Sequence, residues 1–196
     1  MRIKEIETEE EELSVNPKDV INENNIKGDT ERAISSLKKE IAEILVTQIA
    51  HELYNQNLYK TFANYFGVKG FLKLEEYYLK RADEEYNHSE WIKEYLNDCD
   101  VIFQYPQIDK VEVTINNLIE PFILTVDKEI DTTDKINEIA IKTLSLPDLA
   151  TFNFLQKLIS EQIEEEKISR TILSIAKMED TWLIKEKTIL DFYNQG

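Results

Sequence analysis

The chain has 196 residues, of which 42% are hydrophobic and 32% charged, and its formal net charge at pH 7 is −16. This length and composition suit one globular domain with a buried core. The acidic excess argues against nucleic acid and anionic membranes as partners, whereas it suits attraction of cations or plain solubility.

Residues 1–35 are predicted to form an acidic N-terminal extension that is flexible or loosely packed. Six glutamates lie between Glu5 and Glu12, and Pro17 follows them. The opening residues lack the apolar segment of a secretory signal peptide, and no stretch approaches the roughly 20 apolar residues of a membrane helix. Cys99 is the only cysteine, so the chain forms no internal disulfide, and we expect a cytoplasmic protein.

From Ser36 onward the apolar residues recur with helical periodicity, and residues 36–196 are predicted to be the folded domain. A first helix is expected over 36–65 and a second over 71–97, joined by a turn that contains two glycines. The whole chain has only four glycines and four prolines, which leaves room for long helices and little for a turn-rich β fold.

The next segment, about residues 98–115, predicts a long crossover. It contains Pro106 and the alternating sequence VEVTI, so we expect it to be irregular or briefly extended. About 18 extended residues can span about 60 Å, which exceeds the roughly 40 Å length of a 27-residue helix. One connection of this length is typical of a helix bundle with a single crossover.

Two further long helices and a short one follow. The third is expected over 117–144, with Pro121 in its first turn, and the fourth over 148–177, with Asp148 as N-cap. A short last helix fits residues 182–193. The predicted fold class is therefore all-α: a four-helix bundle of two antiparallel hairpins, with one long crossover and a short fifth C-terminal helix.

Each long helix carries an apolar stripe that is interrupted near its middle by polar residues of the kinds that bind metals. Since the four helices have similar lengths, these positions are expected to meet at one height inside the bundle. In chain order, the interruptions are Glu52, then Glu85 and His88, then Glu129, then Gln162 and Glu165.

Four buried carboxylates must take up protons, pair with cationic side chains or bind metal. No lysine or arginine is expected on the stripes at that level, so the pattern favours two divalent ions. Oxygen ligands with one imidazole and no thiolate suit iron or manganese. Glu85 and His88 are i, i+3 neighbours, a spacing that lets two side chains reach one ion. Taken singly, an ExxH pair is usually a surface pair, but the coincidence on four helices favours a di-metal site.

Three segments resemble the non-haem bacterial ferritins. They are IAHELYNQNLY, ADEEYNHSEWIKEYL and ATFNFLQKLISEQIEEE, which are similar to parts of the first, second and fourth helices of that family. The third segment contains EQxxEE, the most specific of these patterns. The resemblance runs from about Ser36 to the C-terminus and implies a ferritin-like fold. Helix bundles of this type carry di-iron sites built from carboxylates on facing helices.

By position, the resemblance implies a first iron held by Glu52, Glu85 and His88, with Glu85 bridging. The ligands implied for a second iron are Glu129, Glu165 and, more weakly, Gln162.

The resemblance also implies roles for four other residues. Tyr59 corresponds to a tyrosine beside the iron centre, and a plain core aromatic is an equal interpretation. A third, more inward iron site of some bacterial members matches Glu84, Glu161 and Glu164. The same three side chains are also consistent with solvated glutamates that line a cavity.

Two features separate the chain from related families. Its fourth helix carries QxxE and not a second ExxH, unlike bacterioferritins, rubrerythrins and ribonucleotide-reductase-like proteins. Its methionines, Met1 and Met178, lie outside the second helix, where bacterioferritins place a haem ligand. The resemblance therefore implies iron as the only cofactor, and no haem.

The function implied by the resemblance is iron storage. Such a subunit oxidises Fe²⁺ with O₂ or H₂O₂ at a ferroxidase centre of two irons and stores Fe³⁺ mineral in a hollow shell of 24 identical subunits. One alternative is a non-storage di-iron oxidase or peroxidase with the same site. Another is a structural or assembly protein that keeps the fold and has weak activity.

Overall fold

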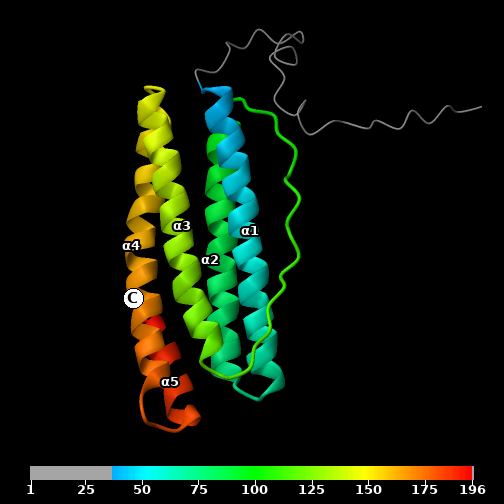
Figure 1. Cartoon of the computed structure of the whole chain (residues 1–196), viewed down its shortest axis with the longest axis vertical. Coiled ribbons are helices and arrows are strands. Elements are labelled where there is room, and N and C mark those ends of the chain that lie inside the picture. Colours follow the sequence, from blue (N-terminus) through cyan, green and yellow to red (C-terminus); the bar gives the residue numbers. More distant parts are fainter. Residues whose placement is uncertain (1–36, 196) are drawn as a thin grey trace, which may run out of the picture.

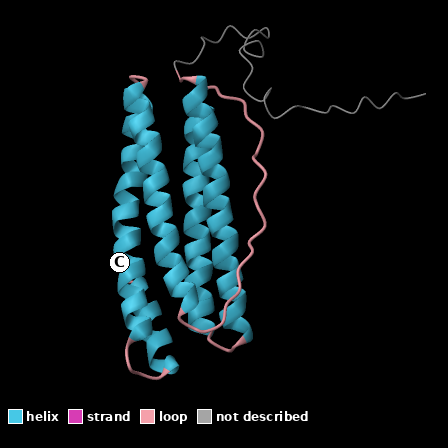
Figure 2. Ribbon diagram, viewed as in Figure 1, coloured by secondary structure: helices cyan, strands magenta, loops and turns pink. Residues whose placement is uncertain are grey.

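The structure is a computed structural model that describes residues 37–195. This part of the chain contains no strand and five helices, shown in Figures 1 and 2: α1 (Lys39–Val68), α2 (Leu72–Asp98), α3 (Glu120–Ser145), α4 (Leu149–Lys177) and α5 (Trp182–Tyr193). The predicted helix ends differ from the observed ones by three residues at most. The acidic extension predicted for residues 1–35 lies outside the described residues, and its boundary stays a prediction.

The four long helices form two antiparallel hairpins. In the turn between α1 and α2, Gly70 has a φ of +83°, a left-handed conformation that glycine adopts without strain. Between α3 and α4, the Asp148 carboxylate accepts a hydrogen bond from the backbone N–H of Thr151 at 3.1 Å. Asp148 is therefore the N-cap that its sequence position predicts.

The connection between α2 and α3, residues 99–119, runs along the length of the bundle (Figure 1). It returns the chain to the end of the bundle from which α2 started, so α2 and α3 point the same way. Alternate side chains of its VEVTI segment, Val111, Val113 and Ile115, are half-buried against the core, and the residues between them are exposed. The crossover thus lies extended on the bundle without pairing as a strand. The predicted all-α bundle with one long crossover and a short fifth helix is confirmed.

The core consists of two apolar clusters at different heights. One lies around the α1–α2 turn and α5, and it includes Phe62, Phe66, Tyr78, Phe122 and Ile189. The other lies toward the opposite end and includes Ile41, Leu45, Ile92, Ile136 and Leu155. Along every long helix, the residues between these clusters are the polar interruptions of the stripes.

Candidate metal centre

A layer of buried polar side chains separates the two apolar clusters. It draws on the middle turns of all four long helices, as the interrupted stripes predict. Its principal members are Glu52, Asn55, Arg81, Glu85, His88, Glu129, Thr132, Gln162 and Glu165.

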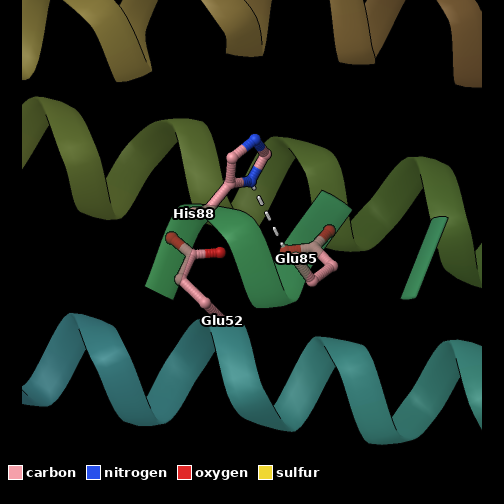
Figure 3. A group of neighbouring side chains, drawn as sticks. All are labelled: Glu52, Glu85 and His88. Atoms are coloured by element: carbon pink, nitrogen blue, oxygen red, sulfur yellow. Dashed lines mark ion pairs between the residues drawn. The ribbon is translucent and has the colours of Figure 1, made fainter. Parts of the chain in front are cut away.

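One half of this layer is a group of three metal-ligand side chains where α1 faces α2. Glu52 extends from α1, and Glu85 and His88 lie one turn apart on α2 (Figure 3). One ligand atom from each residue lies within 4.8 Å of the other two, and all three side chains are buried. Within residues 37–195, no other three histidine, cysteine or acidic side chains come together in this way.

Two carboxylate oxygens in this group lack a hydrogen-bond donor. Glu52 Oε1 accepts a hydrogen bond from Gln48 Nε2 at 2.7 Å, whereas Glu52 Oε2 and Glu85 Oε2 are buried and accept none. His88 Nδ1 is 3.9 Å from Glu85 Oε2, which is too long for a hydrogen bond. Buried acceptors without donors are costly, and a divalent cation bound between these atoms would satisfy them. Carboxylates with an imidazole fit an Fe²⁺-type ion.

The pKa values of the two glutamates move in opposite directions. Burial and the negative charge of Glu85 raise the pKa of Glu52 well above its usual range. Burial, the largest single influence, would also raise the pKa of Glu85, but His88, Glu52 and the Arg81 charge together outweigh it and lower that pKa. Opposite shifts in two neighbouring carboxylates favour a state in which the pair holds one proton between them. A cation that binds both carboxylates must displace this proton.

The other half of the layer contains a cation that the sequence pattern did not predict. Arg81, on α2, is only 1% exposed. Its Nη2 donates a hydrogen bond to Glu129 Oε1 on α3 at 2.6 Å, and its Nη1 donates to Glu165 Oε2 on α4. The expectation that no lysine or arginine lies at this level was therefore wrong. Burial opposes the charge of Arg81, but Glu129 holds the pKa of Arg81 above its usual value, so the guanidinium stays charged.

Three donors fix the position of Glu129. Besides Arg81, the Tyr59 hydroxyl donates to Glu129 Oε1, and Gln162 Nε2 donates to the Glu129 backbone carbonyl at 3.1 Å. The Tyr59 ring also packs against Tyr78, with ring centroids 6.1 Å apart. The Tyr59 hydroxyl thus belongs to the polar layer and its ring to the neighbouring aromatic cluster. A tyrosine beside the metal centre and a core aromatic each describe part of its surroundings.

Comparison with known proteins decides the family. The family model described as a ferritin-like domain matches residues 42–178, well over half of the chain. The chain belongs to the ferritin family. It is 31% identical to the bacterial non-heme ferritin of Campylobacter jejuni over 142 residues, which cover 72% of this chain and 85% of that protein. It is 35% identical to the bacterial non-heme ferritin of Escherichia coli O6:H1 over 140 residues, covering 70% and 83%.

Solved structures agree on the fold of this ferritin. A closed form of the Archaeoglobus fulgidus ferritin, engineered by mutagenesis, superposes with a TM-score of 0.76 at 24% identity and covers 79% of this chain and 97% of its own. Chlorobium tepidum ferritin superposes with a TM-score of 0.71 at 23% identity, covering 81% and 96%. The resemblance seen in the sequence motifs is thus confirmed at the level of family and fold. No helix among residues 37–195 of this ferritin is long and apolar enough to cross a membrane.

The three glutamates matched to a third iron site do not come together in this ferritin. Glu84 is half-buried and bound by Arg81 Nη1 at 2.7 Å and by the Tyr193 hydroxyl of α5. Glu161 is half-buried and Glu164 is exposed, both on α4. Neither forms a three-ligand group with Glu84. A third iron site therefore stays a prediction, and Glu84 already has two partners.

The sequence pattern missed several residues of the buried polar layer, including Asn55 and Thr132. Two other missed residues, Gln48 and Arg81, share one signal. Gln48 lies four residues before Glu52, and Arg81 lies four residues before Glu85. Side chains at this spacing lie on one face of a helix. The polar residues one turn before Glu52 and one turn before Glu85 therefore belong to the same buried layer.

Proposed function

We propose that this ferritin subunit binds Fe²⁺ at Glu52, Glu85 and His88, oxidises it, and stores Fe³⁺ as mineral inside a hollow shell of 24 copies. The observation that carries the proposal is the buried three-ligand group with two carboxylate oxygens that accept no hydrogen bond. Membership of the ferritin family and the non-heme ferritin relatives support iron as the substrate. No haem is part of the proposal.

The residues divide the chemistry between them. Glu52, Glu85 and His88 hold a ferrous ion, and the charge of Glu85 also acts on Glu129 in the second half of the layer. Glu129, Glu165 and Gln162 line the position of a second ferrous ion. Each Fe²⁺ loses one electron, and two of them with two protons reduce O₂ to H₂O₂. Carboxylate oxygens favour the product, because Fe³⁺ carries the higher charge.

Features of the surface support assembly with further copies of the chain. Leu183 and Ile184 on α5 are 74% and 51% exposed, and Met178 just before α5 is also exposed. Apolar groups gathered at one end of a subunit fit burial against neighbouring subunits. The net charge of −16 suits attraction of Fe²⁺ to such a particle. The cytoplasmic location stays a prediction.

One sample measured in two ways tests the proposed function. Light scattering should give the size of a hollow shell of 24 subunits, and the same sample should oxidise Fe²⁺ rapidly in air. Rapid oxidation by a small particle would instead support a non-storage oxidase or peroxidase. A shell without oxidation would support an assembly protein of ferritin fold.

Deletion of residues 2–33 should leave both measurements unchanged. The reason is that the three proposed ligands, the two core clusters described above and α1–α5 are formed by residues 37–195. The size is checked by light scattering and the initial oxidation rate by absorbance. Failure to assemble would show that the extension is a structural element. An assembled particle with several-fold slower uptake would show that the clustered glutamates help to gather Fe²⁺.

A further inference from the structure

The Arg81 guanidinium joins three helices inside the polar layer. Arg81 belongs to α2. Its Nη2 donates a hydrogen bond to Glu129 of α3 at 2.6 Å, and its Nη1 donates one to Glu165 of α4. Its terminal carbon also lies 5.5 Å from the centre of the Tyr59 ring, within reach of a cation–π contact. With a side chain 1% exposed, Arg81 is a fully buried cation held by buried carboxylates.

Glu129 and Glu165 are the two carboxylates that the proposed function assigns to a second ferrous ion. In the structure they already face a positive charge, whereas no lysine or arginine of residues 37–195 lies at ion-pair distance from Glu52 or Glu85. A metal ion and a guanidinium cannot occupy the same space between two carboxylates, and two cations at that distance repel each other. The two halves of the layer are therefore not equivalent as metal sites.

Glu84 is a third carboxylate partner of the Arg81 guanidinium, at the edge of the buried layer. Arg81 Nη1 lies 2.7 Å from Glu84 Oε2, and the Glu84 side chain is 37% exposed, at the edge of the buried layer. The Tyr193 hydroxyl of α5 donates to the other oxygen of Glu84 and so holds this carboxylate in place. A guanidinium that leaves Glu129 and Glu165 keeps Glu84 as its partner.

We propose that Arg81 occupies the second cation position of this centre, so that each subunit binds one divalent ion tightly and a second only when the guanidinium withdraws to Glu84. This inference rests on the proposed function for the Glu52–Glu85–His88 half. It goes beyond that function because it makes the second binding event a competition between a metal ion and an arginine of the same chain.

Zinc, which has no redox chemistry, is the probe that tests the inference on the full-length assembled protein. Calorimetry should give one tight Zn²⁺ per subunit for the wild type, and anomalous diffraction should place it between Glu52, Glu85 and His88. In Arg81→Met, a second tight Zn²⁺ should bind between Glu129 and Glu165, with its affinity raised about tenfold or more over the wild type.

The thermal midpoint of metal-free Arg81→Met supplies a second readout that does not depend on counting bound ions. Without metal this variant should unfold at a lower temperature, since two buried carboxylates lose their partner, and Zn²⁺ should restore it. The matched control is Arg170→Met on α4, where the arginine pairs with Glu166 and its side chain is 53% exposed. That control should keep one tight Zn²⁺ and nearly the wild-type midpoint.

Glu129→Gln tests the same inference without changing Arg81. If the guanidinium fills the second position, this variant keeps the single tight Zn²⁺ of the wild type. The Arg81 inference would be overturned if Glu129→Gln bound fewer tight Zn²⁺ ions per subunit than the wild type. It would also be overturned if the buried layer of the wild type bound two tight Zn²⁺ ions. Either result would leave the proposed Glu52–Glu85–His88 site standing. Absence of tight Zn²⁺ from the wild-type layer would overturn both.

Discussion

Replacing Glu85 by alanine is expected to slow the initial oxidation of Fe²⁺ by about 100-fold or more while the particle stays assembled. Loss of groups that merely support metal ligands costs about 10–100-fold in metal affinity or activity, so loss of a ligand costs at least as much. Glu85 is buried within ligand distance of Glu52 and His88, and its charge also acts on Glu129. No other described side chain can replace it in the three-ligand group.

The fold should tolerate Glu85→Ala because the change removes a buried negative charge from a crowded layer. Light scattering should therefore give the wild-type particle size, and stopped-flow absorbance should show the lost oxidation. Glu94→Ala is the matched control, since Glu94 is an exposed glutamate of the same helix. Wild-type kinetics in an assembled Glu85→Ala particle would remove Glu85 from the centre and with it the proposed site.

Sequence periodicity predicted the four long helices well because each runs for 26 to 30 residues and carries an apolar stripe. The ends were also marked locally: Gly70 adopts a left-handed conformation after α1, and Asp148 caps α4. The long crossover followed from counting residues between helices, since a short link cannot reach the far end of the bundle. None of these features depends on a contact distant in sequence.

The occupant of the second metal position could not be predicted in the same way. Arg81 lies three residues after Tyr78 and four before Glu85, so it shares their face of α2. An arginine at such a position usually extends its charged end to water. Here its partners are Glu129 and Glu165, which come from two other helices, and only the packed bundle brings them within hydrogen-bond distance. The sequence predicted the buried carboxylates, and tertiary packing decides what neutralises them.

Replacing Phe66 by alanine is expected to lower the free energy of unfolding by about 3–5 kcal/mol, the usual cost of removing a buried phenylalanine ring. Phe66 is 0% exposed, and its ring stacks on Tyr78 of α2 and lies 5.6 Å from Phe122 of α3. Trp182 of α5 stacks on the same Phe122. The cavity would therefore open where three long helices and α5 meet, and neighbouring rings cannot close it without losing their own contacts.

Phe66→Leu is the control, since it keeps most of the volume and should cost less than about 1.5 kcal/mol. Urea unfolding at one fixed subunit concentration, followed by circular dichroism, measures both variants, because assembly makes stability depend on concentration. Phe66 lies 14 residues beyond Glu52 on α1, roughly 21 Å along the helix axis. Folded Phe66→Ala should therefore bind Zn²⁺ as the wild type does. A loss below about 1 kcal/mol would mean that the aromatic cluster collapses around the missing ring, and altered Zn²⁺ binding would mean that this cluster positions the metal ligands.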